Sequence, residues 1–148
     1  MDNSPFRWSV STAVAVFDDD GRVLIQRRRD NGRWELPGGC VDPQETPWRA
    51  ARRECEEETG VRPRNLKLSG CYTRCDVPVT EFVFAADMHT GTPKASDEAT
   101  ESRFVPIEEA VAMVGPIFYR KIHAAWQAAE MNAPAAIDYD RHDTNQWL

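Results

Sequence analysis

The sequence predicts an α/β domain in which a mixed β-sheet is flanked by helices. Strand-like runs stand on both sides of a capped helix, and an amphipathic helix follows the later strands. This order, strands then helix then strands then helix, is typical of helices packed on the faces of one sheet. At 148 residues, without an internal repeat or a linker, the chain is expected to be a single domain over residues 1–148.

The chain opens with two expected strands. Residues 9–17 are β-prone, with valines on one face and small side chains on the other, and residues 22–28 continue in the same manner. Asp20 and Gly21 between the two runs are a hairpin signal. A polar loop then leads to a short strand at Trp34.

A helix is expected over about residues 46–59. Thr46 followed by Pro47 is an N-cap and first-turn signal. Gly60 suits the position just beyond the end of the helix, where a left-handed backbone is common. This helix is therefore bounded by caps at both ends.

The second half of the chain returns to strands. Apolar residues alternate over residues 66–72 and again over residues 82–86, with a connection over residues 73–80 that contains Pro78. The later elements are expected in this order: a polar loop over 89–98, a short strand over 103–105, a helix or turn over 106–114, an amphipathic helix over 116–131 and a tail over 131–148.

Three carboxylates share one face of the helix over residues 46–59. Glu54, Glu57 and Glu58 stand at positions i, i+3 and i+4, whereas Glu56 points elsewhere and is expected to be a solvated charge. Like charges this close repel one another unless protons or a cation offset them. Hard oxygen ligands favour Mg²⁺, with Mn²⁺ as the alternative.

The run from Gly39 to Val61 fixes a longer pattern around these carboxylates. Written out, it is G-x5-E-x7-R-E-C-x-E-E-x-G-V, and it resembles the box of the Nudix hydrolases, G-x5-E-x7-R-E-U-x-E-E-x-G-U, where U is aliphatic. Cys55 at the first U is the one departure, and cysteine packs as a small hydrophobe. The matching positions are Gly39, Glu45, Arg53, Glu54, Glu57, Glu58, Gly60 and Val61.

The resemblance implies a fold and a set of roles. The fold is the α/β/α Nudix sandwich, over about residues 6–130. The implied metal ligands are the Gly38 carbonyl, Glu57 and Glu58, with Glu54 either completing the shell or accepting a proton from water. Arg53 and Glu45 are implied to form a pair that orients these carboxylates. A plain surface pair between Arg53 and Glu57 is the alternative.

The function implied is Mg²⁺-dependent hydrolysis of a diphosphate bond in a nucleoside diphosphate derivative or a nucleoside triphosphate, as in clearing of the nucleotide pool. An ADP-ribose or nucleotide-sugar pyrophosphatase is the alternative within the same chemistry. A non-catalytic nucleotide sensor is an alternative from another functional class. Such sensors usually lose glutamates of the box, whereas this chain keeps all of them. An isopentenyl diphosphate isomerase needs a motif around Cys40 that is not present.

A further carboxylate is expected in the loop before the last strand, because many Nudix enzymes take a general base or extra ligand from that region. Glu98 and Glu101 are both candidates. Glu98 is preferred because its surroundings are more loop-like, while Glu101 lies nearer the strand.

Residues outside the box are expected to set specificity. Arg27 and Arg29 alternate at the end of a strand and are candidates for binding phosphate, with a solvated strand end as the alternative. Tyr72 and Phe82 are candidates for stacking on a base, although aromatic residues in strands are more often core.

Composition limits the partners. The chain has a net charge of −6, and its sequence contains no basic stripe that would bind duplex nucleic acid. We therefore expect a small-molecule nucleotide as the partner. No secretory segment and no apolar run of 18 residues is present, so the expectation is a cytoplasmic protein with no membrane partner. A homodimer is left open.

Overall fold

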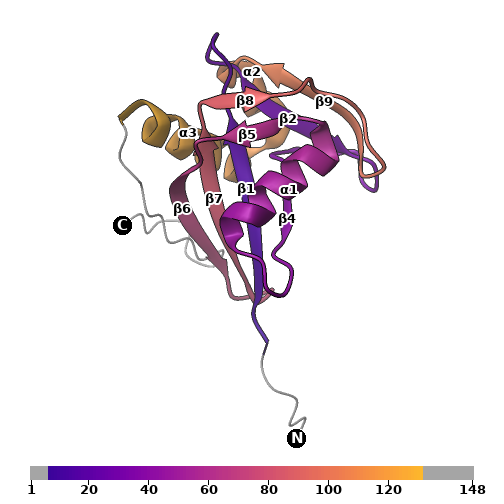
Figure 1. Ribbon diagram of the computed structural model, residues 1–148, viewed down its shortest axis with the longest axis vertical. Coiled ribbons are helices and arrows are strands. Elements are labelled where there is room, and N and C mark those ends of the chain that lie inside the picture. The colour runs from indigo at the N-terminus through magenta and orange to yellow at the C-terminus, as the bar shows by residue number, and fades with distance from the viewer. Residues whose placement is uncertain (1–6, 132–148) are drawn as a thin grey trace, which may run out of the picture.

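The computed structural model describes residues 7–131, so the predicted tail falls almost entirely outside the described residues. Helices and strands occur in the predicted order (Figure 1). The elements are β1 (Ser9–Val16), β2 (Val23–Arg28), β3 (Trp34–Glu35), β4 (Gly38–Cys40), α1 (Pro47–Thr59), β5 (Arg62–Arg64), β6 (Lys67–Arg74), β7 (Val79–Ala86), β8 (Met88–Thr90), β9 (Ala99–Val105), α2 (Ile107–Val114) and α3 (Pro116–Met131).

The central sheet is mixed, as predicted. Its four strands lie in the order β4-β1-β7-β6. β1 and β7 pair in parallel, from Ser9 opposite Val79 to Val16 opposite Ala86, while the other two pairs are antiparallel. A three-stranded sheet, β3-β2-β9, and a two-stranded ribbon, β5-β8, complete the strands of the described range.

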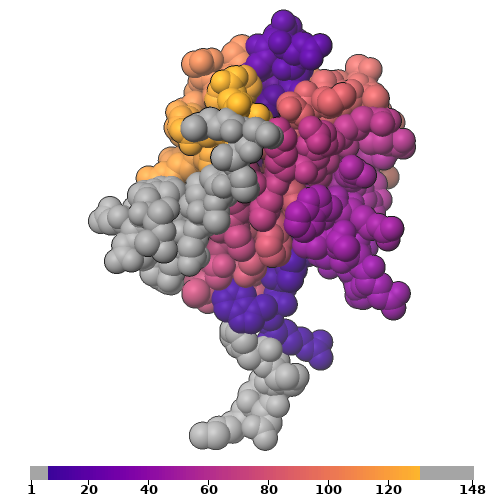
Figure 2. Space-filling view, turned by 60° about the vertical axis from the view of Figure 1, so that its left-hand side comes forward, coloured from indigo at the N-terminus to yellow at the C-terminus, as the bar shows by residue number. Residues whose placement is uncertain are grey.

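Helices cover both faces of the central sheet. Val14 and Phe84 pack with Cys55 of α1 in one core cluster. Val83 packs with Ile122 of α3 in the other, because neighbouring strand residues point to opposite faces. Figure 2 shows α3, in yellow-orange, and α1, in purple, on opposite sides of the strands. This confirms the α/β/α arrangement and the packing of Cys55 as a small hydrophobe.

Both predicted caps of α1 are present. The Thr46 hydroxyl accepts a hydrogen bond from the backbone N–H of Arg49 at 3.3 Å, and Pro47 is the first helical residue. Gly60 has a φ of 75°, a left-handed conformation that glycine adopts without a steric penalty. The helix therefore begins and ends where its sequence specifies, and its buried residues Ala51 and Cys55 mark the face that meets the sheet.

Three local features differ from the sequence prediction. Residues 62–64 and 88–90 pair as β5 and β8, where a loop was expected from residue 89 onward. β9 begins at Ala99 rather than at residue 103. A β-bulge between Leu68 and Gly70 places Leu68 on the α1 face and Tyr72 on the α3 face, because the extra residue reverses the alternation. No helix within residues 7–131 is long and apolar enough to span a membrane.

Candidate active site

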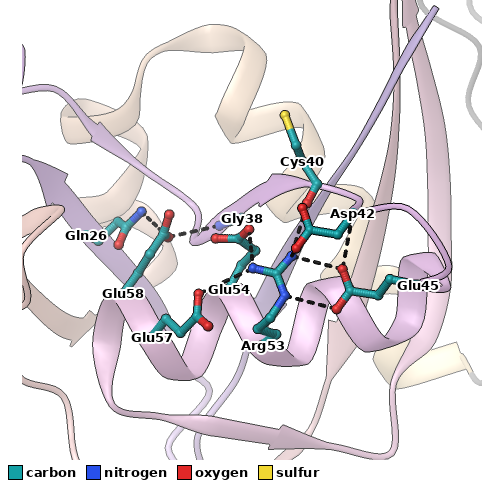
Figure 3. A network of polar contacts seen from close by, with 9 residues as sticks. All are labelled: Gln26, Gly38, Cys40, Asp42, Glu45, Arg53, Glu54, Glu57 and Glu58. Carbon is teal, nitrogen blue, oxygen red and sulfur yellow. Dashed lines mark hydrogen bonds and ion pairs between the residues drawn. The ribbon is translucent and has the colours of Figure 1, made fainter.

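Three glutamates of α1 form the centre of the site (Figure 3). Glu58 is buried, Glu54 is nearly so, and the Glu57 side chain is 57% exposed. Glu56 points away from them and binds the Arg62 guanidinium at 2.5 Å. The structure therefore separates Glu56 from the other three carboxylates, as the helical spacing predicts.

Glu58 is a carboxylate held inside the protein. It accepts a hydrogen bond from the backbone N–H of Gly38 at 3.1 Å and another from the side-chain amide of Gln26. Burial raises the pKa of Glu58 to about 8, and the negative charges of Glu54 and Glu35 act in the same direction. Within residues 7–131, no lysine or arginine forms an ion pair with Glu58 that would offset this cost.

Glu54 lies against the backbone of β4. A Cβ atom at Gly39 would lie 2.5 Å from the Glu54 carboxyl carbon, so glycine is needed for this close approach. Burial raises the pKa of Glu54, the Arg53 guanidinium lowers it, and the charges of Glu57 and Glu98 raise it again. The backbone of β4 and the side chain of Glu54 are therefore in close contact.

Arg53 ties the helix to the loop that precedes it. Its Nε and Nη2 atoms each donate to the Glu45 carboxylate at 2.9 Å. Its Nη1 atom donates to Glu54 at 2.7 Å and, more loosely, to Glu57 at 3.3 Å. Nη2 also reaches the Cys40 carbonyl at 3.2 Å. The contact with Glu57 is therefore one part of a larger network and not an isolated surface pair.

The raised pKa of Glu58 predicts a pH-dependent stability. From about pH 4.3, the pKa of an unfolded glutamate, up to about pH 8, the folded protein binds a proton at Glu58 that the unfolded chain has lost. The stability of metal-free protein should therefore fall as the pH rises through this window, by at most about 1.4 kcal/mol per pH unit from this one group. Thermal unfolding from pH 5 to pH 8 measures the fall. Glu58→Gln should unfold with a shallower pH dependence, and an unchanged dependence would contradict the assignment.

Glu98 lies in the loop that leads into β9, close enough for its charge to raise the pKa of Glu54. Arg29 fastens this loop: its backbone N–H donates to the Glu98 carbonyl at 2.8 Å. Its guanidinium donates to the carbonyls of Ser96 and Asp97 at 2.8 and 3.0 Å. Arg29, predicted as a phosphate ligand, holds the loop that carries Glu98.

Glu101 has a different environment. It lies within β9 opposite Arg27, and its carboxylate is 3.3 Å from the Arg103 guanidinium. Both side chains are about half exposed. Of the two candidates, Glu98 is the one whose charge raises the pKa of Glu54, whereas Glu101 pairs with Arg103.

A cavity of ≈ 870 Å³ lies on the α3 side of the sheet. Tyr72, predicted to stack on a base, lines this cavity. Phe82 does not, because it lies opposite Cys71 in the β6–β7 register and packs on the α1 face. Arg27 is exposed and donates to the Gly32 carbonyl at 3.1 Å.

Arg28, which the sequence analysis did not single out, lines the cavity instead of Arg27 or Arg29. Its guanidinium donates to Glu35 at 3.1 Å, and both residues line the cavity. A β-bulge between Arg27 and Arg28 shifts the register with β9, which strict alternation does not anticipate. Gln26 and Glu35 were also not singled out by the sequence analysis. Gln26 donates to Glu58, and Glu35 lies opposite Gln26 in the β2–β3 register.

The donor chemistry fits a divalent cation. Among the described residues no three acidic, histidine or cysteine side chains are gathered closely enough, as they stand, to enclose a metal ion. The oxygens of Glu54, Glu57 and Glu58 nevertheless project from one helix face beside the β4 backbone. They are hard ligands of the kind that Mg²⁺ and Mn²⁺ prefer. The exposed Glu57 side chain has the freedom to turn toward the other two.

Comparison with known proteins agrees with this geometry. A family model for the NUDIX domain matches residues 7–126. A MutT-like protein of Streptomyces ambofaciens is 36% identical over 115 residues, which cover 78% of this chain and 75% of that protein. An ADP-ribose pyrophosphatase of Methanocaldococcus jannaschii is 36% identical over 113 residues, which cover 70% of this chain and 67% of that protein.

The fold has solved counterparts. The crystal structure of a MutT NUDIX hydrolase from Burkholderia pseudomallei superposes with a TM-score of 0.71 at 24% sequence identity. The match covers 80% of this chain and 98% of that structure. Residues 7–126, which match the family model, therefore contain both the central sheet and the carboxylates of α1.

Proposed function

This chain belongs to the NUDIX family, and from that premise we propose that it hydrolyses a diphosphate bond in a nucleotide with the help of a divalent cation. The observation that carries the proposal is the set of three carboxylates on one face of α1, beside the backbone of β4. Glu57, Glu58 and the Gly38 carbonyl would hold Mg²⁺ or Mn²⁺, with Glu54 completing the shell. When bound, the cation supplies positive charge that offsets the diphosphate oxygens and favours ionisation of the attacking water.

The protein's own groups would orient the reaction and accept the proton. Arg53 donates to Glu45 and Glu54 and, more loosely, to Glu57. It would therefore orient Glu54 beside the substrate while Glu57 turns to meet the cation. As water attacks phosphorus, the phosphorus–oxygen bond to the leaving phosphate breaks. Glu98 would take the proton that the water loses, and Arg29 holds its loop in reach of Glu54.

If Glu98 is the base, Glu98→Gln should lower kcat at neutral pH by about 10²-fold while metal binding changes little. The pH–rate profile should also lose the acidic limb that titration of this carboxylate produces. Glu101→Gln is the matched control and should be mild, because Glu101 contacts Arg103 rather than the carboxylates of α1. The reverse ranking would move the role to Glu101, and two near-silent variants would return it to Glu54.

The substrate within this chemistry has a second candidate. The 36% identity to an ADP-ribose pyrophosphatase favours ADP-ribose as the alternative to a nucleoside triphosphate. A metal-dependent screen over nucleoside triphosphates, oxidised triphosphates, nucleotide sugars and ADP-ribose distinguishes them by the phosphate products released. Binding of nucleotides without turnover of any of them would favour a sensor instead and would contradict the proposed function.

A further inference from the structure

Gln26 is a buried residue with no part in the reaction described so far. It lies on β2 and is only 2% exposed. On this strand it points to the same face as Leu24, which packs with residues of α1. A buried side-chain amide needs hydrogen-bond partners to replace the water it has lost. The partners of Gln26 therefore indicate its role.

Gln26 and the backbone of β4 share one oxygen of Glu58 (Figure 3). The side-chain amide of Gln26 donates to Oε2 of Glu58, and the backbone N–H of Gly38 donates to the same oxygen at 3.1 Å. These two donors use both lone pairs of that oxygen. No hydrogen bond within residues 7–131 reaches the other oxygen, Oε1. One oxygen of Glu58 is thus held by the protein, and the other remains able to bind a cation.

The direction of the Gln26 amide is set by the charges around it. Glu35 lies opposite Gln26 in the β2–β3 register. Burial raises the pKa of Glu35, whereas the Arg28 guanidinium and a hydrogen bond from Gln26 lower it. The amide nitrogen therefore faces two carboxylates, which only accept hydrogen bonds when they are ionised. Turning the amide over would place its oxygen against their negative charge.

The oxygen of the same amide is left unpaired. Gln26 Oε1 is buried and has no hydrogen-bond partner among the described residues. A buried acceptor without a donor costs free energy. An apolar side chain of similar length, such as methionine, would leave no atom of its own unpaired at this position. Stability alone therefore does not explain an amide here, whereas the hydrogen bond to Glu58 does.

We propose that Gln26 is a positioning residue for the divalent cation. Together with the N–H of Gly38 it fixes Oε2 of Glu58, so that Glu58 meets the cation through Oε1 alone. This inference rests on the proposed function, which places the cation at Glu58. Removal of a group that orients a metal ligand typically lowers metal affinity or activity by about 10- to 100-fold.

The test measures Mn²⁺ binding to nucleotide-free protein by electron paramagnetic resonance, in which free Mn²⁺ gives the signal. Gln26→Met keeps the length of the side chain and removes its donors, so the Kd should rise by about tenfold or more. Ser69→Ala is the matched control. It also removes a buried hydrogen bond, from the Ser69 hydroxyl to the Val83 carbonyl at 2.9 Å, but on β6, at the opposite edge of the central sheet from β4. Its Kd should equal that of wild type.

An unchanged Kd in folded Gln26→Met would overturn the inference, because Gln26 would then serve the fold alone. Gln26→Asn takes the place of Gln26→Met if the latter does not fold. It keeps an amide on a side chain one methylene shorter, so it should weaken Mn²⁺ binding in the same way. Thermal unfolding of each variant establishes that the protein measured is folded.

A double-mutant cycle tests whether Gln26 acts through Glu58. In the Glu58→Gln background, Gln26→Met should leave the Kd for Mn²⁺ nearly unchanged, because the carboxylate that Gln26 positions is already absent. The same increase in both backgrounds would show that Gln26 acts by another route and would overturn the inference.

Hydrolysis gives a second readout and separates this inference from the proposed function. The Mg²⁺ concentration for half-maximal activity should rise in Gln26→Met, while kcat at saturating Mg²⁺ stays close to wild type. Weakened Mn²⁺ binding by this variant, in a protein that hydrolyses no nucleotide, would support the role of Gln26 and contradict the proposed function. Unchanged Mn²⁺ binding with hydrolysis intact would overturn the role of Gln26 and leave the hydrolase standing.

Discussion

Removal of divalent cations is expected to abolish hydrolysis. Under the proposed function the diphosphate binds beside the carboxylates of Glu54, Glu57 and Glu58. The cationic side chain that contacts Glu54, Arg53, is already occupied by Glu45 and Glu54. Without added positive charge the substrate would meet a negative surface. Protein stripped of metal and assayed in excess chelator should therefore show no turnover above background.

Restoring the cation is the control for this experiment. Addition of Mg²⁺ or Mn²⁺ to the stripped protein should recover the activity, whereas Na⁺ at equal ionic strength should not. Stability in chelator must be checked by thermal unfolding, so that loss of fold is not mistaken for loss of a ligand. Full turnover in chelator would contradict the role given to the three carboxylates.

Glu57→Gln and Glu58→Gln should each lower kcat by about 10²-fold or more with the fold intact, the size expected for loss of a transition-state electrostatic contribution. Glutamine keeps the shape of the side chain and removes its charge. Glu58→Gln should even remove the free-energy cost of raising the pKa of this buried group, so it should not unfold the protein. The reduced kcat would then report on the site and not on stability.

Glu56→Gln is the matched control on the same helix. Glu56 is a glutamate of the same helix that points to Arg62 instead of toward β4. Its variant should stay near wild type in kcat. If it were as damaging as Glu57→Gln, the identification of the catalytic face of α1 would be wrong.

The parts of the structure that the sequence predicts are those set by local chemistry. Thr46, Pro47 and Gly60 determine where α1 begins and ends, and helical geometry then places Glu54, Glu57 and Glu58 on one face. The order of the strands follows in the same way from alternation and turn residues. Neither inference needs knowledge of distant contacts.

The parts that sequence does not predict depend on register. Two β-bulges, between Arg27 and Arg28 and between Leu68 and Gly70, change which side chains face the cavity. Arg28 therefore lines the cavity, a position that strict alternation along β2 does not indicate. The hydrogen bond from Gln26 to Glu58 joins residues 32 positions apart in the chain, so no local pattern signals it.

Product analysis tests the central claim most directly, namely that the carboxylates of α1 direct hydrolysis of a diphosphate bond. Phosphorus NMR with Mg²⁺ would compare wild type with the triple variant Glu54→Gln, Glu57→Gln and Glu58→Gln on the best nucleotide of the screen. The account predicts that wild type splits the diphosphate into two phosphate products while the folded triple variant leaves the nucleotide intact. Formation of the same products by the triple variant at the wild-type rate would contradict it.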